Sequence, residues 1–268
     1  MNTDHAAFTG SIPENYEKYI GPLLFEPYAL DLAERINIFG IDSVLETACG
    51  TGRATMHLRK LFPKTTELIA TDLNDAMLDV AKKTIGEEGI TFQLADAQEL
   101  PFDDICFDLV VCQFGFMFFP DKPKAFSEAY RVLQPDGCLL FNTWDKLENN
   151  QLINTANTIV TKFFEKDPPE FYKTPFSMYD ENVLRKLMQD AGFRNIEITK
   201  VAKEGTSPTS EDAVKGLITG NPINNEITDR DPAALEKISK EVESEIIKRF
   251  GNGPVVTELN AIVCKGTK

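Results

Sequence analysis

The sequence predicts an α/β protein with a doubly wound, mostly parallel sheet and helices on both faces. Short apolar runs alternate with amphipathic stretches of helical length between residues 41 and 143, a pattern typical of parallel strands joined by crossover helices. The first apolar run also ends in a glycine-rich turn that leads directly into a helix. Glycines in this context let the chain turn sharply and let a ligand approach the backbone.

The first three predicted strands each end in an acidic residue. The first strand ends at Glu46, just before Gly50 and Gly52, and the next two end at Asp72 and Asp96. In parallel sheets of this kind, ligands bind beyond the carboxyl ends of the strands. We therefore expect the three carboxylates and the glycine turn to lie together. The alternative for each aspartate alone is a helix cap or a turn residue.

The remaining elements follow from apolar periodicity, caps and turn residues. Residues 107–112 and 138–144 are predicted as the fourth and fifth strands, with a turn at 135–137, and residues 196–201 and 255–264 as two closing strands. The predicted helices are residues 22–36, 52–62, 74–86, 121–133, 148–166, 180–191, 210–219 and 231–249.

Charge and cysteine content limit the partners and the compartment. The net charge is −14 and the basic residues form no run, which argues against a nucleic-acid partner because such a partner needs a positive surface. Five cysteines include no Cys-x-x-Cys pair, and no apolar stretch has the length of a signal peptide or a membrane span. We expect a cytoplasmic protein without a membrane or nucleic-acid partner.

The motifs together resemble one family. Glu-x-x-x-Gly-x-Gly from Glu46 to Gly52, Asp72 at the end of the second strand and Asp96-Ala97 at the end of the third are similar to the class I S-adenosylmethionine-dependent methyltransferases. Residues 100–110 and 131–137 match as well. The small-molecule subgroup that includes the ubiquinone/menaquinone-biosynthesis methyltransferases is the most similar. The resemblance covers residues 40–145, with weaker similarity on either side.

This resemblance implies a Rossmann-like sheet of seven strands with an antiparallel last strand and helical cap insertions. It implies S-adenosyl-L-methionine as cofactor and in-line methyl transfer to a small organic acceptor. The expected organisation is one methyltransferase domain over residues 1–268, with an N-terminal helical lid (1–40), a cofactor-binding core (41–144), a helical cap or substrate region (145–192 and 203–253) and closing strands (194–202 and 255–264).

Roles for individual residues come from the same resemblance. Glu46 would orient the ammonium group of the methionine moiety, Asp72 would accept hydrogen bonds from the ribose hydroxyls, and Asp96 would accept one from the adenine amino group. The predicted cofactor-binding set is Glu46, Ala48, Gly50, Gly52, Asp72, Leu73, Met77, Asp96, Ala97, Gln98, Cys112 and Gln113. The predicted substrate-lining set is Tyr16, Tyr19, Phe114, Phe118 and Phe176, for which ordinary core packing is the alternative.

Other function classes stay open at this stage. A nicotinamide-dependent oxidoreductase is one alternative, although Thr55 stands where a dinucleotide fingerprint has its third glycine. A protein that binds S-adenosylmethionine without catalysis is another. The two histidines, His5 and His57, suggest neither a metal site nor a general base, so no catalytic residue is predicted. The oligomeric state is also open, with a homodimer as one option.

Overall fold

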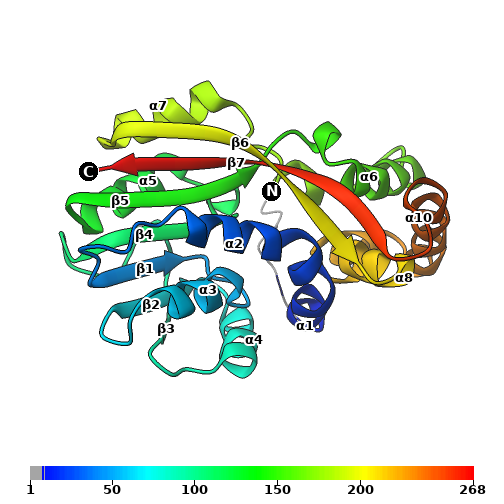
Figure 1. Cartoon of the computed structure of the whole chain (residues 1–268). Helices are drawn as coiled ribbons and strands as arrows, with labels where there is room; N and C mark the ends of the chain where they lie inside the picture. The colour runs from blue at the N-terminus through cyan, green and yellow to red at the C-terminus, as the bar shows by residue number, and fades with distance from the viewer. Residues whose placement is uncertain (1–7, 9) are drawn as a thin grey trace. The chain divides into compact units, whose positions relative to one another are not determined.

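A computed structural model describes residues 8 and 10–268, and these form a seven-stranded sheet flanked by helices (Figure 1). The strand order is β3-β2-β1-β4-β5-β7-β6. The first five strands in this order run parallel, and β7 runs antiparallel to β5. The predicted fold class is thereby confirmed. The strands are β1 (Ser43–Thr47), β2 (Glu67–Asp72), β3 (Thr91–Leu94), β4 (Phe107–Gln113), β5 (Leu133–Trp144), β6 (Arg194–Ser207) and β7 (Val255–Thr267).

The helices comprise α-helices, two π-helices and three short 3₁₀ turns within the described residues. The α-helices are α1 (Ile12–Asn15), α2 (Glu26–Glu34), α3 (Arg53–Leu61), α4 (Asp75–Ile85), α5 (Lys122–Val132), α6 (Gln151–Phe163), α7 (Glu181–Ala191), α8 (Ser210–Val214), α9 (Ile223–Arg230) and α10 (Ala234–Phe250). The π-helices are η1 (Tyr16–Phe25) and η5 (Lys215–Thr219), and the 3₁₀ turns are η2 (Phe116–Phe118), η3 (Leu147–Asn149) and η4 (Phe171–Lys173).

The order of the strands explains where a ligand can bind. The strand β1 pairs with β2 on one side and with β4 on the other. The chain therefore winds outward in both directions from this point, and the carboxyl ends of β1 and β4 border the crevice that such a switch of winding leaves. Glu46 lies in the middle of this sheet, opposite Ala70 of β2 and Val111 of β4.

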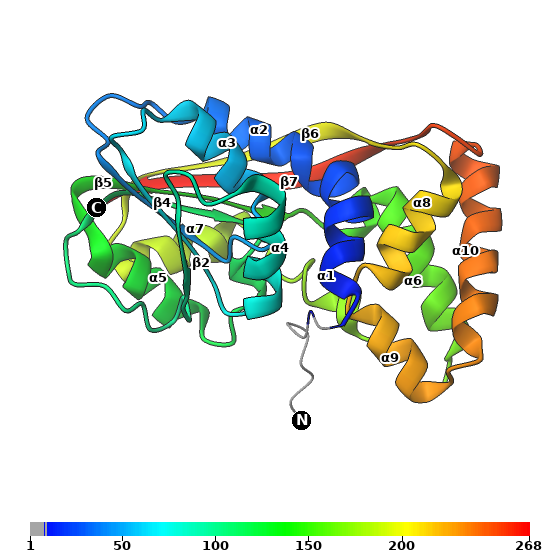
Figure 2. The same cartoon turned by 90° about the horizontal axis from the view of Figure 1, so that it is seen from below.

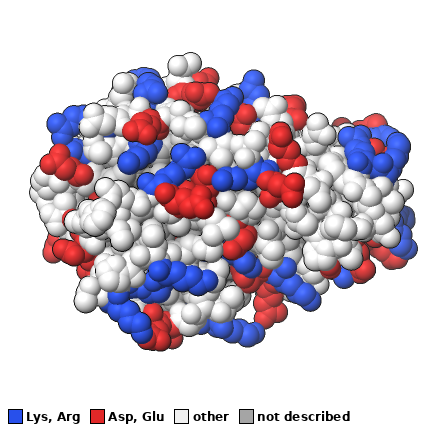
Figure 3. Space-filling view, viewed as in Figure 1, with Lys and Arg blue, Asp and Glu red and all other residues white. Residues whose placement is uncertain are grey.

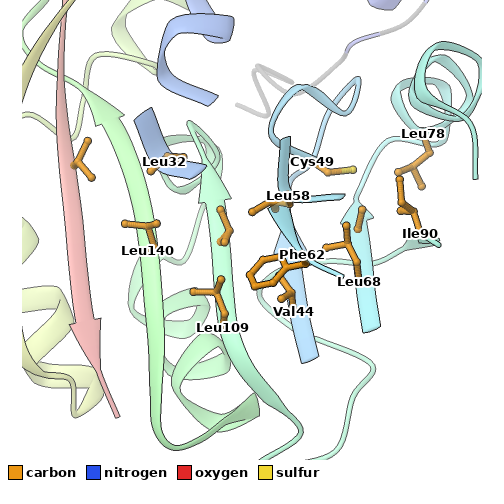
Figure 4. Close-up of a cluster of buried hydrophobic side chains, with 13 residues drawn as sticks. Leu32, Val44, Cys49, Leu58, Phe62, Leu68, Leu78, Ile90, Leu109 and Leu140 are labelled. Carbon is orange, nitrogen blue, oxygen red and sulfur yellow. The ribbon is translucent and has the colours of Figure 1, made fainter. Parts of the chain in front are cut away.

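One face of the sheet packs against α2, α3 and α4. Leu32 of α2, Leu58 of α3 and Leu78 of α4 belong to one buried apolar cluster with Val44 and Leu109 of the central strands (Figure 4). Alternate residues of a strand point to the same face, which is why the apolar positions of several strands meet in a single core. Figure 2 shows α2 and α3 on this side of the sheet and α5 and α7 on the other.

The opposite face has an aromatic core. The ring of Phe116 stacks on Phe126 of α5 with centroids 4.2 Å apart and lies 4.8 Å from Phe141 of β5. The helix α7 contacts α5 and ends at Gly192. Gly192 has φ +106°, a backbone conformation that favours glycine, so it forms the predicted C-cap.

The described residues divide into two compact units. The sheet unit consists of residues 28–145, 178–201 and 261–268, and the helical unit contains residues up to 27, 146–177 and 202–260. Within the helical unit, α10 packs against α6, α8 and α9. The helix α7 belongs to the sheet unit, and its buried residues are Leu184 and Met188; the expected division into lid, core and cap stays a prediction.

Several local predictions differ from the structure. The helix expected over 22–36 is α2 preceded by the π-helix η1, whose wider turns accommodate Pro22. The helix α9 was not predicted, because it follows Gly220-Asn221-Pro222 and is mostly polar. The strand β5 begins before the predicted turn at 135–137, with a register irregularity against β4. None of the helices in the described part of the chain is both long and apolar enough to cross a bilayer.

Candidate functional site

The glycine turn after β1 has a left-handed backbone at three positions. The φ angles are +52° at Ala48, +57° at Gly50 and +86° at Gly52. A Cβ at Gly52 would lie 2.8 Å from Cδ1 of Ile85 and 3.3 Å from Cβ of Ala81, so a side chain here would have to displace Ile85 and crowd Ala81 of α4. The turn thus needs glycine at position 52 for both conformation and packing.

Asp72 ties this turn to the end of β2. Its Oδ2 accepts the Gly50 amide at 2.8 Å, and its Oδ1 accepts the Asn74 amide, also at 2.8 Å. Burial raises the pKa of Asp72, and these backbone amides oppose that rise. A carboxylate has about four acceptor positions, so both oxygens can accept further donors. Asp72 therefore shapes the turn and retains acceptor positions at the carboxyl end of β2.

Glu46 is fully buried and is the most perturbed carboxyl group of the site. Neither of its carboxylate oxygens has a hydrogen-bond partner of good geometry among the described residues. Burial raises the pKa of Glu46 to about 8, and the nearby Asp72 carboxylate adds to the rise, while Thr55 of α3 opposes it. A buried carboxylate without a cation is costly. The position is therefore suited to bind a positively charged group.

Asp96 lies at the end of β3 and is held by Gln98. Its Oδ1 accepts the Gln98 backbone amide at 2.8 Å, and the Gln98 side-chain Nε2 donates to Oδ1 and Oδ2 at 3.1 and 3.3 Å. The Gln98 Oε1 in turn accepts the Asp121 amide at 2.7 Å. Gln98, predicted to contact the cofactor, thus has a clear role in orienting Asp96. Ala97 lies between them and is partly exposed.

Two predicted apolar contacts lie beside these carboxylates. The Leu73 side chain directly after Asp72 is 62% exposed, which is unusual for an aliphatic residue at the end of a central strand. Met77 is buried in α4, and its Cε lies 3.6 Å from the position that a Cβ on Gly50 would take. Leu73 thus offers an open apolar surface next to Asp72.

The carboxyl ends of β4 and β5 contribute the remaining residues of the candidate site. Cys112 is buried, which raises the pKa of its thiol to about 12, so the thiol stays protonated at neutral pH. Gln113 is partly exposed at the end of β4. Phe114 is buried, and its ring stacks on Trp144 of β5 at 4.1 Å. The Tyr28 ring packs edge-on against the rings of Phe114 and Trp144, with centroid distances of 5.4 and 5.5 Å, respectively.

The predicted substrate-lining residues divide between the two units. Phe114 and Phe118 belong to the sheet unit, and Tyr16, Tyr19 and Phe176 to the helical unit. Tyr16 stacks on Phe25 at 5.1 Å, and the Tyr19 ring has the Nζ atoms of Lys18 and Lys215 at 4.9 and 5.7 Å from its centroid. Phe176 is only 6% exposed, which favours packing for that residue. Phe118 is half-buried.

Three residues of this region were not predicted from the sequence. Thr55, Asn142 and Thr143 are fully buried, and the Thr55 hydroxyl, the Asn142 Nδ2 and the Thr143 hydroxyl each lack a hydrogen-bond partner within the described residues. A polar residue inside an apolar strand, such as Asn142 after Leu139, Leu140 and Phe141, is the signal that could have identified the latter two.

The geometry fits a cofactor that combines a cation with a nucleoside. The buried carboxylate of Glu46 suits an ammonium group, the Asp72 oxygens suit vicinal hydroxyls, and exposed Leu73 suits a flat base. No group of three or more His, Cys, Asp or Glu side chains with metal-site geometry occurs in the part of the chain that the structure describes. Fold and site together define an α/β protein of the doubly wound class, with residues at the switch point of its sheet that fit a nucleoside-containing cofactor.

Comparisons with known proteins identify the family. A family model described as a methyltransferase domain matches residues 45–141. A demethylmenaquinone methyltransferase from Lactobacillus johnsonii is 30% identical over 186 residues, which span 63% of this chain and 74% of that protein. A ubiquinone/menaquinone biosynthesis C-methyltransferase from Shewanella halifaxensis is 29% identical over 174 residues, with 59% and 68% covered. The chain belongs to the class I S-adenosylmethionine-dependent methyltransferases, and S-adenosyl-L-methionine is its methyl donor.

Solved structures share the fold at low identity. The YcgJ protein from Bacillus subtilis has a TM-score of 0.59 at 20% identity, covering 90% of this chain and 98% of that one. A phosphoethanolamine N-methyltransferase 2 from Haemonchus contortus has a TM-score of 0.63 at 18% identity, covering 99% and 58%. These similarities concern the fold alone. Membership of the family decides against the nicotinamide-dependent alternative.

Proposed function

We propose that the protein transfers a methyl group from S-adenosylmethionine to a small, flat organic molecule that is uncharged or cationic. The observation that carries the cofactor part is the buried Glu46 carboxyl, whose two oxygens have no hydrogen-bond partner of good geometry among the described residues, although Thr55 lies beside it. An ammonium group is the simplest ligand that would offset this burial. The bound cofactor supplies an activated methyl group, so no catalytic triad is required.

The chain's own residues then bind, orient and exclude water. Glu46 would fix the methionine end and Asp72 the ribose, while Asp96, held by Gln98, would receive the adenine amino group. Leu73 and Met77 would cover the base. The backbone of Cys112 and Gln113 would close the methionine end. Alignment and exclusion of water account for most of the rate in a displacement of this type.

Two observations support a flat, apolar acceptor. Phe114, Trp144 and Tyr28 gather at the carboxyl ends of β4 and β5 in the sheet unit, and although they are at least as buried as Phe176, they keep this end of the sheet low in polarity. The net charge of −14 disfavours a polyanionic substrate, and Figure 3 shows acidic and basic side chains interspersed on the face in view. The curated relatives named above are by name enzymes of quinone biosynthesis, so a reduced quinone ring is our first candidate.

Aromatic residues of the helical unit are our second candidates for acceptor recognition. The partly exposed rings of Tyr16 and Tyr19 support this role better than Phe176, which is buried. Phe118, half-buried after β4, is the candidate from the sheet unit besides Phe114. These assignments concern specificity and do not bear on cofactor binding.

Methyl transfer from radiolabelled S-adenosylmethionine tests the proposal. The acceptors would be a reduced demethylated naphthoquinone with a short side chain, phosphoethanolamine, an oligonucleotide and an unfolded protein. We expect label in the hydroquinone and none in the two polymers. Efficient methylation of the oligonucleotide or the protein would contradict the proposed acceptor class. Binding of S-adenosylhomocysteine without turnover on any acceptor of the small-molecule class would favour a non-catalytic role.

A further inference from the structure

The turn after β4 has a strained backbone at a residue that is not glycine. Phe114 has φ +51°, in the left-handed region that side chains rarely adopt. Such a conformation persists only where the surrounding structure holds it in place, and it tends to occur at functional sites. Ala48, at the end of the neighbouring strand β1, has φ +52°. The two strained residues follow adjacent central strands at the switch point of the sheet.

The two turns also touch each other through Gly115. A Cβ at Gly115 would lie 2.6 Å from the Cβ of Ala48 and 2.6 Å from the Sγ of Cys112. The turn after β4 therefore packs directly against the glycine turn after β1, and a shift of one displaces the other.

One buried side chain holds the Phe114 backbone. Asn142 is the in-register partner of Gln113 on the parallel strand β5, and its Oδ1 accepts the Phe114 amide at 2.9 Å. Asn142 is 0% exposed, and its Nδ2 has no hydrogen-bond partner among the described residues. An apolar residue of the same size would avoid this unmet donor. The hydrogen bond that this side chain does make, from the Phe114 amide to Oδ1, supports the left-handed conformation of Phe114.

We infer that Asn142 is a positioning residue for the methyl-transfer site, acting through the Phe114 amide to hold the end of β4 beside the cofactor. The cofactor's place at this edge rests on the proposed function. Asn142 keeps the left-handed turn in place, and the turn fixes the backbone of Cys112 and Gln113 and, through Gly115, the position of Ala48. A site that is displaced slightly loses cofactor affinity without losing the fold.

The chain carries its own reporter for this arrangement. Trp144 is the single tryptophan, it is buried, and its ring stacks on Phe114 at 4.1 Å. Its fluorescence therefore reports on the Phe114 turn, and binding of S-adenosylhomocysteine can be measured independently by calorimetry.

The test combines Asn142→Leu with two further variants. Asn142→Leu should bind S-adenosylhomocysteine about tenfold more weakly than the wild type and shift the Trp144 emission. Thr66→Val is the matched control, because Thr66 is also a buried polar residue of the sheet unit but lies just before the amino end of β2, away from the carboxyl ends of the strands. It should leave the affinity within about twofold and the emission unchanged. In the Phe114→Gly background the turn needs no support, so Asn142→Leu should change affinity less than about twofold.

Several results would overturn the inference. If Asn142→Leu binds S-adenosylhomocysteine as tightly as the wild type, the Asn142 side chain does not position the site. If Asn142→Leu loses the same affinity in the wild-type and the Phe114→Gly backgrounds, Asn142 does not act through the Phe114 turn. If Asn142→Leu does not fold, Asn142→Asp replaces it, because a protonated aspartate keeps the oxygen that accepts the Phe114 amide. Asn142→Asp should bind S-adenosylhomocysteine like the wild type. A tenfold loss of affinity in Asn142→Asp would count against the assignment. Failure of the wild type itself to bind S-adenosylhomocysteine would overturn the proposed function and, with it, this role.

Discussion

The substitution Glu46→Gln should stabilise the cofactor-free protein and weaken cofactor binding. The pKa of Glu46 rises from 4.5 to about 8 in the folded chain because the group is buried. Between these two pH values the folded protein retains a proton that the unfolded chain releases. The free energy of unfolding therefore falls as pH rises through this window, and the loss is complete above about pH 8. Glutamine has no proton to lose, so the variant should lack this part of the pH dependence.

The size of the effect follows from the same values. A pKa difference of about 3.5 at 1.36 kcal/mol for each pH unit gives about 5 kcal/mol between pH 4.5 and pH 8. We expect Glu46→Gln to match the wild type near pH 4.5 and to exceed it by several kcal/mol at pH 8.5. The raised pKa of Asp72 also lowers the free energy of unfolding as pH rises. Because Asp72 is present in both the variant and the wild type, it does not account for a difference between them.

Cofactor binding should change in the opposite sense. The ammonium group of the cofactor favours the charged form of Glu46, so wild-type affinity for S-adenosylhomocysteine should increase from pH 6 to pH 8.5. Loss of this charge-assisted bond should weaken binding by about 2 kcal/mol at pH 8.5, and the affinity of Glu46→Gln should depend less on pH. A gain in stability together with a loss of ligand affinity would show that the buried Glu46 carboxyl lowers the stability of the free protein and contributes to binding.

Urea unfolding at intervals from pH 4.5 to 8.5, with calorimetric titration of S-adenosylhomocysteine, measures both effects. Glu87→Gln is the matched control, because Glu87 is exposed on the loop after α4 and the substitution replaces the same carboxyl group by the same amide. It should follow the wild type in both measurements. The same pH dependence of stability in Glu46→Gln and the wild type, or equally tight binding by the variant, would contradict the role of the buried Glu46 carboxyl.

Four further substitutions test separate parts of the site. Asp72→Ala should weaken S-adenosylhomocysteine binding by about 2 kcal/mol or more in calorimetry, since it removes acceptors for the ribose and the bond to the Gly50 amide; unchanged affinity would place the ribose elsewhere. Gly52→Ala should cost about 2 kcal/mol or more of unfolding free energy, because φ is +86° and the added Cβ would meet Ile85 at 2.8 Å; a wild-type melting curve would contradict this. Phe176→Ala should cost about 3–5 kcal/mol of stability, whereas Tyr19→Ala should lower acceptor turnover with stability nearly intact. Loss of turnover in Phe176→Ala together with loss of stability in Tyr19→Ala would instead make Phe176 the acceptor contact and Tyr19 the packing residue.

The sheet, and the edge at which its first strands end, could be predicted because local sequence determines both. Apolar runs that end in Glu46, Asp72 and Asp96 alternate with amphipathic helices, and only a parallel sheet accommodates that order. The acids therefore had to meet at the carboxyl edge. The roles assigned to the individual residues in cofactor and acceptor binding stay predictions, and so does the N-terminal lid.

Properties that depend on tertiary packing could not be predicted. A strand-end glutamate resembles a surface residue in sequence, and its burial depends on α3, which places Thr55 beside it. The π-helix η1 has apolar positions that also fit an α-helix, so periodicity does not distinguish the two. The hydrogen bond between Asn142 and Phe114 joins residues 28 positions apart, and no local pattern encodes such a contact.

The most direct test of the account is calorimetric titration of the wild-type chain with S-adenosylhomocysteine and, separately, with NAD. We expect one S-adenosylhomocysteine site per chain and no heat of binding from NAD. Binding of S-adenosylhomocysteine at pH 7 should release a proton from Glu46, so the binding enthalpy should depend on the ionisation enthalpy of the buffer. Binding of NAD without binding of S-adenosylhomocysteine would contradict the site. Binding of S-adenosylhomocysteine with an enthalpy that is the same in buffers of different ionisation enthalpy would contradict the role of Glu46.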